Sequence, residues 1–262
     1  MKLLLALLLA VPALALADPL PEGATVIDRI NARNEGVRVT RKLTMKLIER
    51  SGKTRVRETL GYRQYLNDQK RTAIYFLAPG NVKGTAFLTY DYNAAAREDD
   101  NWLYLPAMRK VRRISAADRG DYFLGTDMTY EDMKLETRAA PHDYRYTTLR
   151  EDNSDGHRCL WVQAVPTDAA TEHELGYQRV ESCIDAEIWI ARETRFWDIA
   201  GNPLKTVHIL DIRQIQGIWT PHQINVENHK TGHRTEFTFA DVDYETPIKP
   251  EAFNQNTLQR GP

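Results

Sequence analysis

The sequence predicts a mainly β protein built on one antiparallel sheet. Three observations support this: apolar and polar residues alternate in many short segments, compact turn sequences separate those segments, and few stretches show helical periodicity. Such alternation places one face of each strand against a core and the other face in water. About ten strands of this kind form a sheet long enough that we expect it to curl.

One helix is predicted before the strands. Thr25 is the expected N-cap, Asp28 follows three residues later, and Gly36 is the expected stop. The face expected to be buried contains Val26, Ile27 and Ile30.

The first predicted strand lies in GVRVTRKLTMKLIE, where Arg41 is the one charged residue on an otherwise apolar face. AIYFLAP and TAFLTY follow as strands on either side of a Pro-Gly-Asn turn. A C-terminal meander then joins IWIARETRFWD, LKTVHILDIRQI, IWTPHQINVEN and HRTEFTFADVDY through short turns. Besides the helix, only residues 115–132 are expected to cover a concave face.

Residues 1–17 have the layout of a cleaved secretory signal. Lys2 precedes an apolar stretch, and Ala15 and Ala17 form an A-x-A pattern, so cleavage is expected after Ala17. The alternative, a membrane-spanning helix, is weakened by Pro12 and by Asp18 directly after the stretch. The mature chain is therefore expected to be exported.

The two cysteines, Cys159 and Cys183, are predicted to form a disulfide. Both flanking segments, HRCLWVQAVP and YQRVESCI, have strand patterns, and the intervening TDAATEHELG is expected to be a polar loop. The alternative, a reactive thiol pair, lacks the C-x-x-C spacing typical of one.

Charge and motifs argue against several functional classes. The 35 basic and 36 acidic residues give no basic excess for nucleic acid. The sequence contains no G-x-S-x-G, P-loop or dinucleotide motif. His229 and His233 have no third metal ligand in register. We expect no enzyme activity, no metal and no cofactor.

A soluble carrier of acyl chains needs a large apolar cavity, which a half-open barrel supplies. The candidate lining residues are Val39, Arg41, Leu43, Met45, Leu47, Leu60, Tyr62, Phe76, Phe87, Trp102 and Tyr104. The alternative interpretation is that these side chains form an ordinary dry core.

Residues 102–114, WLYLPAMRKVRRI, and residues 123–133, FLGTDMTYEDM, resemble blocks of the LolA-like outer-membrane lipoprotein-sorting protein family. The resemblance extends over most of the mature chain, to the closing segment PIKPEAFN. It implies an unclosed antiparallel half-barrel of about ten or eleven strands with a few short helices as a lid, in which residues 18–262 form one domain. It also implies a location in the periplasm. The family's functional arginine has no certain match here, and Arg41 is a candidate from pattern alone.

The basic cluster in residues 102–114 is predicted to tie the lid to the sheet. Acidic side chains are frequent downstream, so Arg112 and Arg113 are expected to pair with Asp127, Glu131 and Asp132. Arg109 and Lys110 remain available for an anionic headgroup or for acidic groups of a partner.

The first functional hypothesis is a non-enzymatic periplasmic carrier. It would hold a lipid, or the acyl chains of a lipoprotein, and pass this cargo between an inner-membrane transporter and an outer-membrane acceptor. The alternative is an accessory module that binds a protein of a membrane transporter complex, with its concavity filled by its own side chains. A continuous cavity favours the carrier, and a packed interior favours the module.

Overall fold

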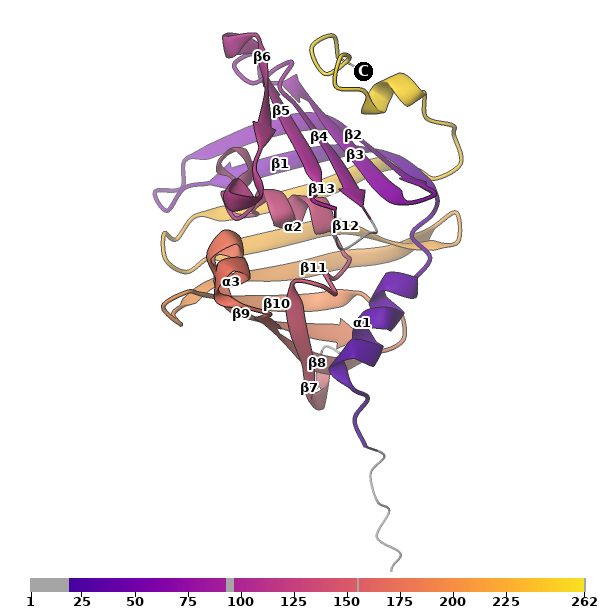
Figure 1. Ribbon diagram of the computed structural model, residues 1–262, viewed down its shortest axis with the longest axis vertical. Helices are drawn as coiled ribbons and strands as arrows, with labels where there is room; N and C mark the ends of the chain where they lie inside the picture. The colour runs from indigo at the N-terminus through magenta and orange to yellow at the C-terminus, as the bar shows by residue number, and fades with distance from the viewer. Residues whose placement is uncertain (1–18, 93–96, 155, 262) are drawn as a thin grey trace, which may run out of the picture.

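The computed structural model of the protein describes residues 19–92, 97–154 and 156–261. The expected signal segment, residues 1–17, lies outside the described residues. All strands in the described part of the chain join one antiparallel sheet in the order β6-β5-β4-β3-β2-β1-β13-β12-β11-β10-β9-β8-β7. The sheet curls without closing, because β6 and β7 are its two edges (Figure 1). The predicted mainly β, unclosed antiparallel architecture is confirmed.

The strands of the first half are β1 (Arg38–Ile48), β2 (Thr54–Leu66), β3 (Gln69–Ala78), β4 (Ala86–Tyr92), β5 (Asp100–Leu105) and β6 (Lys110–Ile114). Those of the second half are β7 (Tyr144–Ser154), β8 (His157–Pro166), β9 (Tyr177–Asp185), β10 (Ala191–Asp198), β11 (Pro203–Ile215), β12 (Ile218–Asn228) and β13 (Arg234–Asp243).

The sheet thus has thirteen strands rather than ten or eleven. The sequence pattern did not single out the two edge strands, β6 and β7. β6 presents mostly exposed cations, and β7 reads YRYTTLREDNS, so neither has the apolar alternation of a half-buried strand. An edge strand has only one neighbour and can remain polar, which weakens its sequence signal.

Three α-helices accompany the sheet in the described residues: α1 (Gly23–Ala32), α2 (Tyr130–Leu135) and α3 (Ala169–Leu175). Short 3-10 turns lie at Pro106–Met108, Ala116–Asp118, Phe123–Gly125 and Pro250–Phe253. Within the described ranges, none of the helices has both the length and the apolar character needed to cross a membrane.

The predicted limits of α1 were wrong, although its buried face was right. The helix begins before Thr25 and has no side-chain cap, and it ends at Ala32, well before Gly36. Gly36 instead has a positive φ of 73° in the connection to β1. The predicted face packs on β8 and β9, where Leu160, Val162 and Ile184 complete its apolar cluster.

The predicted polar loop between the cysteine strands contains α3, so this prediction was also wrong. Asp168 caps the helix by accepting a hydrogen bond from the Thr171 amide at 2.8 Å. Gly176 ends it with a left-handed φ of 74°. Both signals are typical of helix ends, but the segment carries only one buried apolar residue, Leu175.

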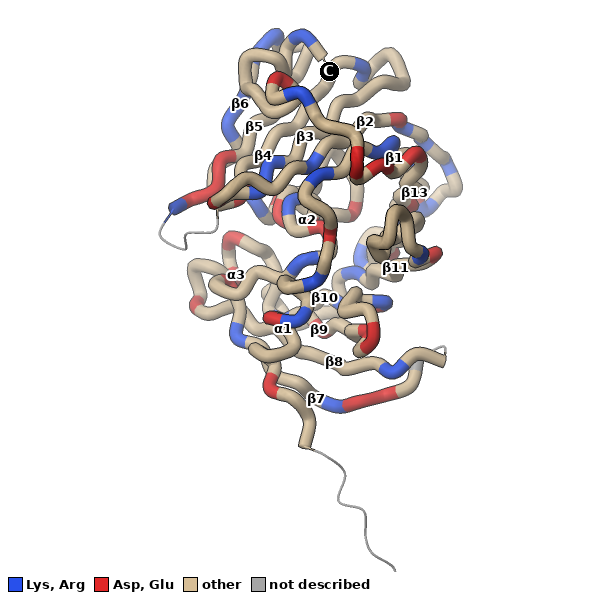
Figure 2. Tube along the Cα trace, turned by 90° about the vertical axis from the view of Figure 1, so that its right-hand side faces the viewer, with Lys and Arg blue, Asp and Glu red and all other residues tan. Residues whose placement is uncertain are grey.

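An inner segment, residues 115–141, lies on the concave side of the sheet. It connects edge strand β6 to edge strand β7, and α2 lies within the curve in both views (Figures 1 and 2). Phe123 is fully buried there and contacts the rings of Phe87 and Tyr130 at centroid distances of 5.2 and 5.5 Å. The part of the concavity around Phe123 is therefore packed with the protein's own aromatic side chains.

The C-terminal segment covers the opposite, outer face of β3–β5. Phe253 and Leu258 are buried against that face. The Tyr75 hydroxyl donates a hydrogen bond to the Ala252 carbonyl at 2.8 Å, and the Tyr90 hydroxyl donates to the Phe253 carbonyl. Consequently both faces of β3 and of the first part of β4 are buried.

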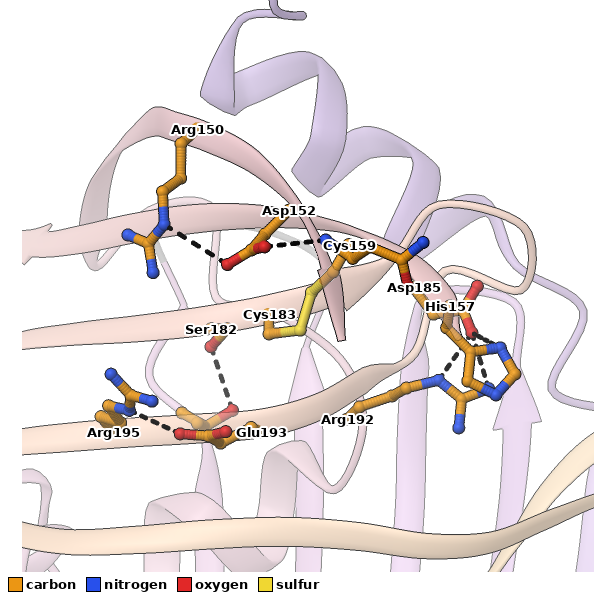
Figure 3. Close-up of a disulfide and its surroundings, with 12 residues drawn as sticks. Arg150, Asp152, His157, Cys159, Ser182, Cys183, Asp185, Arg192, Glu193 and Arg195 are labelled. Carbon is orange, nitrogen blue, oxygen red and sulfur yellow. Dashed lines mark hydrogen bonds and ion pairs between the residues drawn. A yellow bond between two sulfur atoms is a disulfide. The ribbon is translucent and has the colours of Figure 1, made fainter. Parts of the chain in front are cut away.

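The predicted disulfide between Cys159 and Cys183 is confirmed. It links β8 to β9 on the outer face, with a Cα–Cα distance of 5.5 Å (Figure 3). The neighbouring Trp161 is also buried, because the guanidinium groups of Arg150 and Arg195 cover its ring at 4.7 and 4.6 Å. Cation–π contacts of this kind protect an aromatic ring on an otherwise polar face.

Replacement of Phe123 by alanine should lower the free energy of unfolding by about 3–5 kcal/mol, because it leaves a cavity in the aromatic core. Met108→Ala is the control, since Met108 is exposed and should change stability by less than about 0.5 kcal/mol. Urea denaturation measures both. Equal stabilities for the two variants would contradict the packing described for the inner segment.

Candidate functional site

The inner segment is anchored by residues of the sequence block FLGTDMTYEDM. Its helix, α2, begins with a capping box: the Thr129 hydroxyl accepts from the Asp132 amide at 3.1 Å, and the Asp132 carboxylate accepts from the Thr129 amide at 2.8 Å. This arrangement satisfies two backbone donors at the helix start and fixes the position of Asp132.

Asp132 also forms a buried ion pair with Lys205 of β11. The Lys205 ammonium lies 2.6 Å from the Asp132 carboxylate, and its side chain is completely buried. The Tyr177 hydroxyl donates a second hydrogen bond to that carboxylate at 2.9 Å. Burial alone would raise the pKa of Asp132, but the Lys205 charge outweighs it and holds the pKa below its usual range.

Asp127 supplies a second anchor, to β12 and β13. Its carboxylate lies 2.6 Å from His233 Nδ1 and accepts hydrogen bonds from the Thr235 hydroxyl at 2.6 Å and the Asn228 amide at 3.2 Å. Its backbone carbonyl accepts from Lys205 at 2.9 Å. The two aspartates thus attach the inner segment to three neighbouring strands of the sheet.

Glu131 is directed to the other side of α2. Its carboxylate lies 2.8 Å from the Lys134 ammonium, and Lys134 also pairs with Asp99. Burial raises the pKa of Glu131 above its usual range despite the nearby Lys134 and Arg119 charges. This cluster belongs to a polar cavity beside α2, which is separate from the apolar pocket described below.

The predicted pairing of Arg112 and Arg113 with these acids was wrong. Arg112 pairs with Asp118 at 3.7 Å, and Arg113 pairs with Asp100 at 2.7 Å. Both arginine side chains are more than half exposed, at 67% and 58%. The reason is geometric: β6 is the exposed edge of the sheet, whereas the block of acids turns inward to β11–β13.

The true partners, Lys205 and His233, were missed by sequence reasoning. Lys205 shares the inner face of β11 with Val207 and Ile209, so it is a cation on an otherwise apolar strand face. That signal had singled out Arg41 on β1, and it could have identified Lys205 as well. His233 offers no comparable signal, because it lies just before β13.

An apolar pocket lies under the inner segment in the second half of the sheet. About 980 Å³ of space in and around it is free of protein atoms, and this figure includes open solvent. α1 contributes Ile27 and Ile30, and the connection from α2 to β7 contributes residues 135–140. The sheet lines the pocket with side chains of β8–β12, including Val162, Ala164, Val180, Phe196, Val207 and Ile209.

A second pocket adjoins it on the other side of α2. Both pockets are lined by Met128, Asp132, Glu136, Thr137 and Ile224, so α2 and the residues around it separate them. The second pocket has a partly apolar wall, which includes Leu43, Ile74, Phe237 and the half-exposed Trp219.

A cluster of charged residues lies at this second pocket. Arg63 donates to the Glu35 and Glu136 carboxylates at 3.4 and 3.3 Å, and Arg41 pairs with Glu136. Arg33 pairs with Glu35. In Figure 2, basic and acidic positions gather around α2 inside the curve.

Glu35 is ionised at neutral pH in spite of its burial. Burial opposes its charge, but the Arg63 and Arg33 guanidinium groups and the Tyr65 hydroxyl outweigh this effect and lower the pKa of Glu35 to about 2. The Tyr65 hydroxyl donates to the Glu35 carboxylate at 2.5 Å. Arg138 in turn donates to the Tyr65 oxygen at 3.0 Å.

The residues predicted to line a cavity divide between the two faces of the sheet. The inner face holds Val39, Arg41, Leu43, Met45, Leu47, Phe76 and Phe87. The outer face holds Leu60, Tyr62, Trp102 and Tyr104, so their predicted inward orientation was wrong. On β2 the inward side chains are Thr59 and Arg63, with Gly61 between them.

Of the inward set, Arg41 and Leu43 border the second pocket. The others pack beneath the inner segment or against neighbouring strands, as the dry-core alternative anticipated for them. The larger apolar pocket lies instead along β8–β12, strands from which no lining residue had been predicted.

The profile of a family described as "Uncharacterized protein" matches residues 68–260, which is more than half of the chain. The chain belongs to this family. No curated protein matches its sequence.

Solved structures show the same fold. A domain provisionally assigned as an outer membrane lipoprotein-sorting protein, from Vibrio parahaemolyticus, is 27% identical, with a TM-score of 0.81 over 91% of this chain and 98% of that one. A DUF1329 family protein from Desulfovibrio piger is 24% identical, with a TM-score of 0.82 over 90% and 98%. A LolA superfamily protein from Nitrosomonas europaea is 16% identical, with a TM-score of 0.68 over 90% and 99%. The protein therefore has a LolA-like fold.

Replacement of Lys205 by methionine should lower the free energy of unfolding by about 3–5 kcal/mol, because it leaves the Asp132 carboxylate buried without a counter-charge. Arg113→Ala is the matched control: its exposed pair with Asp100 should contribute less than about 1 kcal/mol. Chemical denaturation measures the difference. A larger loss for Arg113→Ala would contradict the assignment of the anchor.

The Glu35 cluster should make stability depend on acid pH. The pKa of Glu35 is about 2 in the folded protein and 4.5 in its unperturbed state, so its stabilisation is complete above about pH 4.5 and is lost as the pH falls towards 2. Glu35→Gln removes this contribution. The unfolding free energies of wild type and variant should differ most near pH 7 and converge as the pH approaches 2. A constant difference across that range would refute the assignment.

Proposed function

We propose that the protein is a non-enzymatic periplasmic carrier that holds an acyl chain, from a lipid or a lipoprotein, in the apolar pocket along β8–β12. The observation that carries this proposal is the pocket itself. Its wall consists of residues from α1, the inner segment and the sheet, and it is partly open to solvent. It is thus an apolar concavity with an entrance, as a soluble lipid carrier requires.

The energetics favour such a site. An acyl chain of about fifteen methylenes costs about 12 kcal/mol to leave in water, so transfer through the periplasm needs an apolar enclosure. The free energy gained by removing the acyl chain from water also offsets the conformational entropy that the chain loses on binding and the cost of moving protein side chains.

The similar structures and the sequence support the cellular setting of the proposal. The Vibrio parahaemolyticus domain is described as a lipoprotein-sorting protein, and the expected signal in residues 1–17 directs this chain to the periplasm. The carrier would receive cargo from an inner-membrane transporter and deliver it to an outer-membrane acceptor. Arg109 and Lys110, both exposed at the edge of the sheet, are candidates for contact with an acidic partner or headgroup.

One observation favours the alternative function, a protein-binding module of a transporter complex without lipid cargo. Phe123, Tyr130 and the strand residues around them fill the part of the concavity over β3 and β4 that lies outside the second pocket. A module of that kind needs a rigid surface and no cavity. The two functions therefore differ in whether the second half of the concavity takes up an acyl chain.

Binding of a fluorescent fatty-acyl probe to the delipidated protein tests the carrier. The probe should bind with its chain in the pocket, and Ala164→Phe should weaken binding at least about tenfold by filling that space. Gln163→Phe is the matched control: it adds the same ring one residue earlier on β8, where side chains point to the outer face, and should leave affinity unchanged.

Urea denaturation shows whether both variants fold, and mass spectrometry of extracts from the purified protein identifies any bound lipid. A folded protein that neither binds the probe nor yields lipid would refute the carrier and favour the protein-binding module. Equal weakening by the two phenylalanine variants would place the chain elsewhere.

A further inference from the structure

A row of buried polar side chains crosses the inner face of β2–β5. Arg63 lies opposite Thr72, Thr72 lies opposite Thr89, and Thr89 lies opposite Asn101. All four residues are more than nine-tenths buried. Each has a polar atom without a hydrogen-bond partner among the described residues: Arg63 Nε, Thr72 Oγ1, Thr89 Oγ1 and Asn101 Oδ1.

Arg63 and Thr72 are the members of this row that line the second pocket, and Arg41 lines it with them. Unpartnered buried donors are rare in folded proteins, because an unsatisfied group loses its hydration without compensation. Arg63 uses its terminal nitrogens on Glu35 and Glu136, so its Nε–H remains available. Together with the Thr72 hydroxyl, it offers two donors at one place in the pocket wall.

Arg41 adds a third group that can bind an anion. Its guanidinium donates one hydrogen bond, from Nη2 to Glu136, and lies 4.8 Å from the centre of the Phe239 ring. About a fifth of its side chain is exposed, at 19%. A guanidinium group has five N–H donors in a planar fork, so most of the Arg41 donors can reach a bound group.

The balance of charge also favours an anion. The guanidinium groups of Arg33, Arg41 and Arg63 contact two carboxylates, those of Glu35 and Glu136. The nearby Asp132 is neutralised by Lys205. The cluster therefore retains a positive charge beside a pocket whose wall is partly apolar.

We propose that Arg41, Arg63 and Thr72 bind the oxyanion head of an amphiphile, a carboxylate or a phosphate, whose chain extends past α2 into the apolar pocket along β8–β12. The two pockets share five lining residues, so they adjoin along the inner segment, and the chain would pass along this shared wall from one pocket to the other. The inference rests on the proposed carrier function and specifies its ligand class: a singly headed anionic amphiphile rather than a neutral lipid.

The test compares ligands that share a chain and differ in the head. Dodecanoate, dodecyl phosphate and dodecanol compete against the fluorescent acyl probe on the delipidated wild-type protein, and inorganic phosphate is tested alone. The two anionic amphiphiles should bind at least about tenfold more tightly than dodecanol, since hydrogen bonds to a charged group are strong where water is excluded. Inorganic phosphate should compete weakly, because it lacks the chain.

Two variants locate the head. Arg41→Gln removes a cation while Glu136 keeps its pair with Arg63, and it should weaken dodecanoate binding about tenfold with little effect on dodecanol. Thr72→Val removes the free hydroxyl and should also weaken dodecanoate selectively. Thr89→Val is its matched control: it removes an equally buried, equally unpartnered hydroxyl from the next strand, outside the pocket lining.

The outcomes separate the two proposals. Equal affinity for dodecanoate and dodecanol would overturn the anion site and leave the carrier intact, whereas failure of all three twelve-carbon ligands to bind would overturn both. Equal effects of Thr72→Val and Thr89→Val would also overturn the anion site, since the row would then act only structurally. Tight binding of inorganic phosphate alone would overturn the amphiphile as ligand.

Discussion

The buried ion pair between Asp132 and Lys205 is the interaction on which the rest of the concave side depends. Lys205 is completely enclosed, and it also donates to the Asp127 carbonyl, so one ammonium group joins both aspartates of the inner segment to the sheet. The pair adds little net stability compared with an apolar contact of the same size, but its hydrogen bonds allow one position of the segment. That position determines which part of the concavity is filled and which part is open.

The two halves of the curved sheet consequently differ. In the first half, Phe123 fills the space over β3 and β4, and the C-terminal segment buries the opposite face. In the second half, α1 and the end of the inner segment cover the concave face of β8–β12, and a pocket lies between them and the sheet. A packed region over β3 and β4 and a pocket along β8–β12 in one continuous sheet would suit the proposed carrier, which would keep its shape while its apolar content changes.

Strand pattern predicted much of this fold. Alternation identified β1 and the C-terminal meander, and the two cysteines with their strand-like flanks predicted the disulfide. Alternation could not show which face of each strand lies on the concave side of the sheet. On β2 the apolar residues Leu60 and Tyr62 point outward, because the first half of the sheet is covered on both sides. Alternation therefore assigned them to the wrong face.

The partners of charged residues were harder to predict than the strands. Asp127 and Asp132 attach the inner segment to the sheet, whereas Glu131 pairs with Lys134 within α2, and Arg112 and Arg113 are near these acids only in sequence. The actual partners of the two aspartates are distant in sequence: His233 lies 106 residues from Asp127, and Lys205 lies 73 residues from Asp132. Only the curl of the sheet brings these strands to the inner segment. The local sequence indicated this pairing only through Lys205, a cation on an otherwise apolar strand face.

The strand order has a consequence for how the chain acquires its structure. β1 pairs with β13, so the first and last strands meet in the middle of the sheet, while both edges come from the middle of the sequence. Every other pairing joins strands that are consecutive along the chain. These local hairpins can form early, but the pairing of β1 with β13 has a very high contact order and must await the whole sequence. Until then the edges of β1 and β13 remain unpaired in addition to those of β6 and β7, and exposed strand edges of this kind favour aggregation.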